Sequence, residues 1–314
     1  MSNKIKVTAP ATIANLGPGF DLIGLALNEP RDFLEVTLEK EGNDVLEVQG
    51  IYANTISKNP EKNSAMVAGR AVLEKVGKEK YSIKMKLIKG VPPRIGLGSS
   101  GASSAAGAYA VNYLLGMPLN MEELLECAMK GEKAACGSPH ADNVAPALFG
   151  GITLILSFNP IKVIKFEPIT NVDIVVITPQ LEIGDEKTRI AREILPKEIS
   201  LHVMVNQMQS FANLIIGIMK KDLKTMGLGI SGDFVIESAR SKLIPKFYDL
   251  KKEALELGAY GFSISGAGPS MFAICPKNLS EYIGRKLVNI LKNEGIDSKF
   301  SIHNNSKEGV IIVP

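Results

Sequence analysis

Aromatic residues are scarce in this 314-residue sequence: Trp is absent, and Phe and Tyr supply all of the 6% aromatic content. A stacking platform for single-stranded nucleic acid is therefore not expected. Positive and negative charges also nearly balance, since 36 Lys and Arg residues and 33 Asp and Glu residues give a net charge of +3. With no basic run along the chain, charge gives no reason to expect nucleic acid or an anionic membrane surface as a partner.

Cysteine and long apolar runs are scarce as well. The three cysteines, Cys127, Cys136 and Cys275, are odd in number and widely spaced, which predicts neither a disulfide framework nor a zinc knuckle and fits a reducing compartment. No stretch approaches the ~20 apolar residues of a membrane span, and the N-terminal segment lacks the apolar core of a secretory signal. We expect a cytoplasmic globular protein, which suits 45% hydrophobic and 22% charged residues.

Hydrophobic periodicity predicts a mixed α+β chain. Residues 81–88 give the clearest strand, since apolar and polar side chains alternate there with the period of a half-exposed sheet. Strands are expected at 4–9, 20–27, 33–39, 44–51, 80–88, 152–158, 161–166, 172–178, 260–265, 270–275, 297–302 and 309–313. Helices are expected at 65–76, 101–115, 121–135, 141–149, 186–195, 200–221, 233–241, 246–257 and 279–294. We place a domain boundary near residue 168, giving domains 1–168 and 169–314.

A glycine- and serine-rich segment, residues 90–106, precedes and opens the helix expected at 101–115. Free backbone N–H groups at a helix N-terminus, with no bulky side chains nearby, bind anions. The segment therefore predicts a phosphate site. The alternative is a flexible loop followed by a tightly packed alanine helix.

Known phosphate-loop templates fit this segment poorly. No Lys follows Gly101, so the P-loop pattern fails. Position 103 is Ser where a protein-kinase glycine loop has Val, and neither H-R-D nor D-F-G occurs. A Rossmann pattern matches literally at Gly96, Gly98 and Gly101, but Pro-Pro-Arg precedes it, a poor end for a buried strand. A nicotinamide dehydrogenase is thus disfavoured.

A fourth template fits better, because Pro93-x-x-Gly96-Leu97-Gly98-Ser99-Ser100 resembles the phosphate loop of the GHMP family of small-molecule kinases. Residues 9–21 (APATIANLGPGFD) and 265–270 (SGAGPS) are similar to the first and third motifs of that family, so the resemblance spans most of the chain. It implies an N-terminal domain like ribosomal protein S5 domain 2, a C-terminal ferredoxin-like α/β sandwich, and ATP as co-substrate. Residues 266–268 are expected to form a turn that closes over the phosphate loop.

The resemblance also implies an ATP and magnesium site. Mg²⁺ would be held by the Ser100 hydroxyl and the Glu132 carboxylate, although Glu132 could instead be a surface charge paired to lysine. Mevalonate-kinase-like relatives place Asp near Asn143, and an amide cannot accept a proton. The acceptor hydroxyl would then attack directly, pass its proton to the γ-phosphate, and leave Asn143 to orient groups. The residues expected to bind ATP are Pro93, Gly96, Leu97, Gly98, Ser99, Ser100, Gly101, Ala102, Ser103 and, for the adenine, Asn63.

Four further segments, residues 15–21, 137–146, 188–196 and 237–245, resemble family members that act on L-homoserine. Such a substrate needs carboxylates for its ammonium and guanidinium groups for its carboxylate. The residues proposed for substrate binding are Asn15, Asp21 and Asp142 for the ammonium, Arg192 and Arg240 for the carboxylate, and Thr188 and His140 for orientation. The alternatives are a helix N-cap at 142–143 and solvated surface arginines.

The expected partners are ATP and L-homoserine, with no nucleic acid, no membrane and a second copy of the chain in a homodimer. Two other functions stay open: a GHMP kinase with a mevalonate-type substrate, and a catalytically silent nucleotide-binding regulator. The presence of both Ser100 and Glu132 argues against the regulator.

Overall fold

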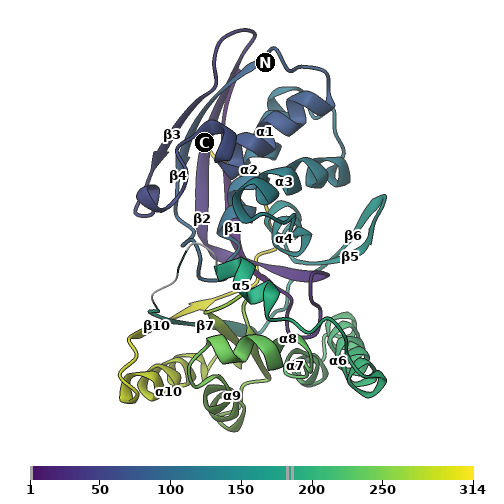
Figure 1. Cartoon of the computed structure of the whole chain (residues 1–314), viewed down its shortest axis with the longest axis vertical. Helices are drawn as coiled ribbons and strands as arrows, with labels where there is room; N and C mark the ends of the chain where they lie inside the picture. Colours follow the sequence, from purple (N-terminus) through teal and green to yellow (C-terminus); the bar gives the residue numbers. More distant parts are fainter. Residues whose placement is uncertain (1–2, 182–183, 185–186) are drawn as a thin grey trace.

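The computed structural model describes residues 3–181, 184 and 187–314, with the backbone alone at 187–188. Two sheets, each covered by helices, follow one another along the long axis of the molecule (Figure 1). The mixed α+β architecture agrees with the sequence expectation. Within the described residues, no helix has the length and apolar character that crossing a membrane requires.

The first sheet has seven strands, and its helices pack together on one face (Figure 1). Its main path runs β11-β1-β2-β4-β3, with β5 added to β2 and β6 to β5; only the β3–β4 pair is parallel. Its strands are β1 (Lys4–Ala14), β2 (Ile23–Glu39), β3 (Val45–Gln49), β4 (Ser82–Ile88), β5 (Ile152–Phe158), β6 (Ile161–Phe166) and β11 (Ile311–Ile312). Its helices are α1 (Ser64–Lys75), α2 (Ser99–Leu114), α3 (Met121–Cys136) and α4 (Ala141–Phe149), with short 3₁₀ turns at Ala53–Thr55 and Pro60–Lys62.

The second sheet is fully antiparallel, in the order β10-β7-β9-β8. This is the strand order of a ferredoxin-like sandwich, as expected. Its strands are β7 (Val172–Pro179), β8 (Gly261–Ile264), β9 (Met271–Pro276) and β10 (Ser298–His303). Its helices are α5 (Lys187–Glu193), α6 (Leu201–Lys220), α7 (Leu223–Ile230), α8 (Ile236–Arg240), α9 (Phe247–Glu256) and α10 (Ser280–Asn293), with a 3₁₀ turn at Ser241–Leu243.

Two elements differ from the sequence expectation. The strands expected at 20–27 and 33–39 are one continuous strand, β2. Helix α7 was not expected, because Gly227 and Gly229 disfavour a helix. Both glycines serve close packing: a Cβ on Gly227 would lie 1.9 Å from the Tyr260 carbonyl oxygen, and one on Gly229 would lie 2.3 Å from the Leu214 nitrogen. Tertiary packing therefore overrides local propensity here.

One face of the second sheet joins the apolar core of the first sheet, and its other face packs with α9 and α10 in a second core. Buried side chains of the first sheet and α2 pack in one cluster with Ile174 of β7 and Leu214 of α6. The predicted boundary near 168 falls between β6 and β7, yet the chain returns to the first sheet at its end, where β11 pairs with β1.

Helix α2 can approach α1 closely because Gly107 faces the Ala65 carbonyl, which a Cβ would meet at 2.1 Å. The glycine loop thus opens onto a tightly packed helix.

Candidate active site

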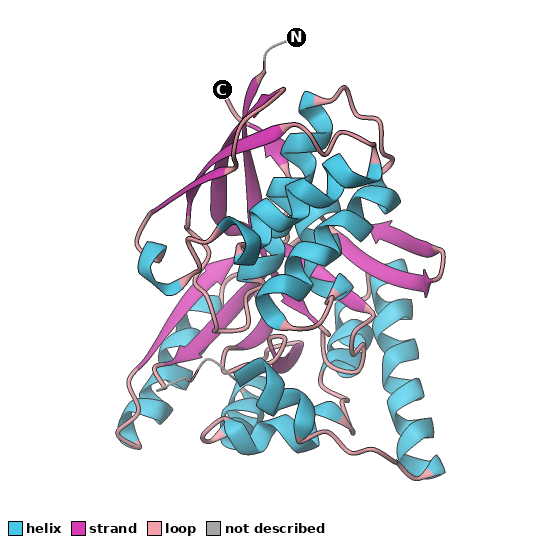
Figure 2. Ribbon diagram, turned by 45° about the horizontal axis from the view of Figure 1, so that its top comes forward, coloured by secondary structure: helices cyan, strands magenta, loops and turns pink. Residues whose placement is uncertain are grey.

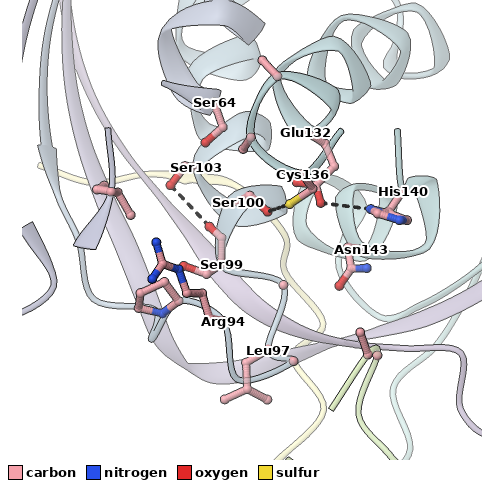
Figure 3. Close-up of a pocket in the computed structure, with 18 of the residues that line it drawn as sticks. Ser64, Arg94, Leu97, Ser99, Ser100, Ser103, Glu132, Cys136, His140 and Asn143 are labelled. Atoms are coloured by element: carbon pink, nitrogen blue, oxygen red, sulfur yellow. Dashed lines mark hydrogen bonds and ion pairs between the residues drawn. The ribbon is translucent and has the colours of Figure 1, made fainter. Parts of the chain in front are cut away.

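A cleft of about 480 Å³ gathers most of the residues that the sequence motifs single out. Its walls come from the 93–100 loop, the C-terminal part of α3, the start of α4, α5, α8 and the 266–267 turn. Figure 3 shows part of it, with serines of the glycine loop opposite Glu132, His140 and Asn143. Segments more than 150 residues apart in sequence therefore meet at one site.

The glycine loop has a backbone that only glycine allows. Gly98 is the N-cap of α2 and has a φ of 62°, and no side chain caps the helix. A Cβ on Gly98 would lie 1.9 Å from Thr12 Oγ1, and one on Gly96 (φ 91°) would lie 2.3 Å from the Ser265 carbonyl oxygen. The first N–H groups of α2 are therefore left to an anion, which argues against a merely flexible loop.

The 265–270 segment closes on this loop. The Ser265 hydroxyl donates to the Gly96 carbonyl at 2.6 Å, and the Ser270 N–H donates to the Ile95 carbonyl at 3.1 Å. Residues 266–268 lie between β8 and β9, so the predicted turn over the phosphate loop is present. The third motif thus holds the loop in place from the second sheet.

A buried ion pair behind the loop escaped the sequence analysis. Lys89 Nζ pairs with Asp32 and also donates to the Ser99 carbonyl at 2.7 Å and to Ser103 Oγ at 2.9 Å. Asp32 Oδ1 accepts the N–H groups of Gly90 and residue 91. The sequence does carry a signal: the alternation in β4 places Lys89 in register with the buried positions 83, 85 and 87. A lysine there requires an internal counter-charge.

Glu132 is positioned to hold a cation. Only 3% of this residue is exposed, so the alternative of a surface charge paired to lysine is wrong. Its Oε1 lies 3.4 Å from His140 Nδ1, whereas its Oε2 is buried without a hydrogen-bond partner. The Ser100 hydroxyl, 3.2 Å from Cys136 Sγ, lines the same cleft. One carboxylate and one hydroxyl suit Mg²⁺, which takes few protein ligands besides substrate phosphates and water.

Asn143 has a fixed orientation. The Thr12 hydroxyl donates to its Oδ1 at 3.3 Å, and the Gly101 backbone packs against it, since a Cβ there would meet the Asn143 Cβ at 3.3 Å. The amide NH₂ is therefore the end left for a ligand in the cleft. Thr12, in the first motif, is another residue that the sequence analysis missed.

Two arginines that line the cleft stack against one phenylalanine. The guanidinium carbons of Arg192 and Arg240 lie 5.3 and 5.1 Å from the centroid of the Phe20 ring. Arg240 is buried and donates to the backbone carbonyls of Ala191 (3.0 Å) and Gly266 (2.9 Å). Burial lowers the pKa of Arg240, yet an arginine stays protonated. Arg240 is thus built into the site and is not a solvated surface residue, whereas the side chain of Arg192 is 40% exposed.

Carboxylates face these arginines. Arg192 Nη2 donates to both oxygens of Asp21, at 3.0 and 2.7 Å. The Asp21 N–H donates to Asn15 Oδ1 at 3.1 Å, and Asn15 Nδ2 donates to the Gly266 carbonyl at 3.2 Å. Both Asn15 (φ 73°) and Asp21 (φ 58°) adopt the left-handed conformation, which Asn and Asp tolerate better than most residues. The first motif is therefore a structured loop that presents Asp21 to the cleft.

Asp142 and His140 complete this end. Asp142 is buried and its Oδ1 has no partner; burial, with help from the charge of Asp21, raises its pKa to about 7. Burial alone lowers the pKa of His140, but the hydrogen bond and charge of Glu132 outweigh it, so the pKa lies above its usual value. An unpartnered buried carboxylate is a receptor for a cationic group.

The cleft brings together nearly all of the predicted residues. Those that line it are Asn15, Asp21, Asn63, Pro93, Gly96, Leu97, Gly98, Ser99, Ser100, Ser103, Glu132, His140, Asp142, Asn143, Arg192 and Arg240. Gly101 and Ala102 lie behind its wall, within the first turn of α2. The side chain of Thr188 lies outside the described residues. The Leu97 side chain is buried and points away from the serines (Figure 3), so only its backbone faces a ligand. Phe20, Lys89, Arg94 and Arg189 line the cleft without having been predicted.

Comparison with known proteins identifies the class. The model of the GHMP kinases N terminal domain matches residues 63–151, and that of the GHMP kinases C terminal domain matches residues 214–293. The chain belongs to the GHMP kinase family and is an ATP-dependent small-molecule kinase.

The two relatives and the solved structure described next are all homoserine kinases. Homoserine kinase of Pyrococcus abyssi is 38% identical over 299 residues, which cover 95% of this chain and 96% of that protein. Homoserine kinase of Methanococcus maripaludis is 40% identical over 274 residues, covering 87% and 88%. The crystal structure of homoserine kinase from Cytophaga hutchinsonii matches with a TM-score of 0.91 at 38% identity, covering 100% of this chain and 98% of that one.

Proposed function

We propose that this chain is a homoserine kinase, which transfers the γ-phosphoryl group of ATP to the hydroxyl of L-homoserine and so forms O-phospho-L-homoserine for threonine biosynthesis. The observation that carries the proposal is the division of the cleft. One end has an anion-binding loop, and the other has carboxylates and guanidinium groups for a zwitterion. The likeness to homoserine kinases supports the same substrate.

The charged residues at one end of the cleft support an assignment of partners for the ammonium and the carboxylate of homoserine. The ammonium pairs with Asp142, whose Oδ1 has no protein partner, and with Asp21. The carboxylate pairs with Arg240 and Arg192, whose planar groups bind carboxylates through two N–H donors. Asn15 holds the Asp21 backbone in place, while His140 orients the substrate from the wall of the cleft. A contact from Thr188 stays a prediction from the sequence. Charge-assisted bonds of this kind are roughly twice as strong as neutral ones.

The glycine loop and its neighbours support an assignment of partners for the ATP phosphates, the adenine and Mg²⁺. The N–H groups of residues 96–101 cradle the phosphates, and Asn63 lies at the adenine side. The hydroxyls of Ser99 and Ser103 donate to the Val91 carbonyl and to Asp32, so they fix the loop from behind. Ser100 and Glu132 would hold Mg²⁺, because Glu132 Oε2 is a buried acceptor without a hydrogen-bond donor among the described residues. When bound, Mg²⁺ neutralises charge on the β- and γ-phosphates.

The transfer itself requires positioning more than covalent chemistry. Asn143 offers its NH₂ toward the cleft because Thr12 holds its Oδ1. An amide takes no proton, so the substrate hydroxyl attacks in line and its proton passes to the γ-phosphoryl oxygens. Asn143 serves as an orienting donor in this scheme.

The chain is proposed to act as a homodimer through the exposed face of α6. Leu201, Val205 and Met208 are 76, 56 and 62% exposed and follow one another at helical spacing, and α6 lies at the outer edge of the molecule (Figures 1 and 2). Such an apolar stripe is costly in water. Sedimentation equilibrium should give about twice the chain mass, and Met208→Glu should give the single-chain mass; a monomeric native chain contradicts the dimer.

The test of function is ADP release with ATP and Mg²⁺ across L-homoserine, mevalonate, galactose, shikimate and no acceptor. Rapid turnover with L-homoserine alone is the expected result. Turnover with mevalonate in its place would keep the ATP site and discard the assignments of Asp21, Asp142, Arg192 and Arg240. Bound ATP without turnover on any acceptor would favour a nucleotide-binding regulator.

A further inference from the structure

Asp21 and Arg192 neutralise each other across the substrate end of the cleft. Arg192 reaches both carboxylate oxygens of Asp21, and the two side chains are only partly exposed, at 40 and 35%. Arg192 comes from α5 and Asp21 from the first motif, 171 residues earlier. The pair therefore joins the two halves of the molecule across the site.

The other two charged groups of this end are arranged differently. Arg240 is held by the carbonyls of Ala191 and Gly266, and no carboxylate of the described residues bonds to it. Asp142 keeps one buried oxygen without any partner. Each charged group of an amino-acid substrate thus finds one receptor that is already available, and a second that is engaged in the Asp21–Arg192 pair.

We propose that the Asp21–Arg192 ion pair is a specificity latch that a zwitterion opens by exchanging partners, and that Asp21 thereby weakens the binding of acceptors that carry a carboxylate without an ammonium. The proposal rests on the proposed function. A zwitterion gives its ammonium to Asp21 and its carboxylate to Arg192, so both members of the broken pair regain an opposite charge. The number of charge pairs does not fall.

An anionic acceptor has no such compensation. 4-Hydroxybutyrate has the chain length, hydroxyl and carboxylate of homoserine but no ammonium. To take the Nη2 group of Arg192, it must displace the Asp21 carboxylate and leave that group facing the pocket alone, beside the charge of Asp142. Leaving a charged group unpaired in a partly buried site costs binding. The site therefore discriminates through an element that repels the wrong ligand, in addition to its contacts with the right one.

The Phe20 ring lets the Arg192 guanidinium change its hydrogen-bond acceptors without leaving its place. The guanidinium of Arg192 rests on this ring together with that of Arg240. A planar cation on an aromatic face keeps this contact while its N–H groups change acceptors. The second guanidinium therefore stays beside the first, where one carboxylate can bridge both.

The variant Asp21→Asn tests the latch, because Asn tolerates the left-handed backbone at position 21 and releases Arg192. Relative to wild type, kcat/KM for L-homoserine should fall about ten- to a hundredfold, the value of one hydrogen bond to a charged group. The Kd for 4-hydroxybutyrate, measured by calorimetry, should instead tighten roughly two- to fivefold, the value of a partly exposed ion pair. A residue with a merely structural role would weaken both ligands.

Asp142→Asn is the matched control, because it removes a carboxylate of the same pocket that holds no arginine. It should weaken L-homoserine without tightening 4-hydroxybutyrate as much as Asp21→Asn does. Unchanged or weaker 4-hydroxybutyrate binding in Asp21→Asn, with an unaltered thermal midpoint, would overturn the latch. Equal tightening in both variants would also overturn it, since that result reports loss of negative charge alone. Failure of wild type to phosphorylate L-homoserine would refute the proposed function, while the calorimetric comparison would still decide the latch.

Discussion

Lys89→Met is the perturbation that most directly probes what holds the phosphate loop. Lys89 follows β4 and is buried against Asp32 of β2, where its Nζ also contacts the Ser99 carbonyl and Ser103 Oγ. Met keeps much of the side-chain volume but removes the charge and the three donors. Asp32 would then remain buried with only the N–H groups of residues 90 and 91 and the Ser103 hydroxyl as partners.

The expected loss is large because the pair has almost no access to water. Removing one partner of a buried ion pair costs about 3–5 kcal/mol, since the other charge stays unpaired. An exposed pair between the same two strands supplies the comparison: Lys84 Nζ lies 2.6 Å from Glu39 Oε1, with side chains 48 and 39% exposed. Such a pair contributes only about 0–1 kcal/mol. The difference of several kcal/mol lies well outside the error of denaturant unfolding.

Urea unfolding of Lys89→Met, Lys84→Met and Lys89→Met/Asp32→Asn measures this difference. Lys89→Met should lose about 3–5 kcal/mol, Lys84→Met less than about 1 kcal/mol, and the double variant less than the sum of its two single changes. Lys89→Met should also raise KM for ATP, because Ser99 begins α2. Equal, small losses in both single lysine variants would refute the reasoning.

Three further predictions concern the chemistry. Glu132→Ala should lower kcat by more than about a hundredfold because it removes the proposed Mg²⁺ ligand, whereas Asn143→Ala should cost less than the ~10²–10⁴-fold of a general base. Equal, small losses in steady-state kcat would contradict both roles. Asp142, with a pKa raised to about 7 by burial, pairs with an ammonium only when ionised. A pH profile of kcat/KM for L-homoserine should therefore rise with pH up to about 7 and then level off, and Asp142→Asn should remove that rise; a rise that persists in the variant would assign it to another group. Gly98→Ala should abolish ATP binding by calorimetry, because its Cβ would lie 1.9 Å from Thr12 Oγ1; native affinity would show that the loop can shift.

Much of the fold follows from local sequence signals. The alternation at 81–88 gave β4, and the Asn120 N-cap with Glu123 forms the capping box that begins α3. Helix α7 could not be predicted in this way, because its glycines oppose a helix and are required only by neighbours distant in sequence. The same holds for β2, whose pairing with β1 is irregular between its residues 26 and 31, where the Asn28 N–H donates to the distant Asn304 carbonyl.

The residues of the candidate site were also predictable from the sequence only in part. Motif resemblance located the glycine loop, Glu132 and the charged residues, because these sit in segments with recognisable spacing. The partnerships could not be read from the sequence: Asp21 with Arg192, Lys89 with Asp32, and the Phe20 ring beneath two arginines join positions far apart in the chain. Such pairs are set by tertiary packing, so no local pattern encodes them.

The most direct test of the central proposal is ³¹P NMR of a reaction containing the protein, ATP, Mg²⁺ and L-homoserine. We predict a new phosphomonoester resonance, which forms in equal amount to ADP and requires L-homoserine. ADP accompanied only by inorganic phosphate, or an unchanged ATP spectrum, would contradict the assignment of this cleft to phosphoryl transfer onto the homoserine hydroxyl.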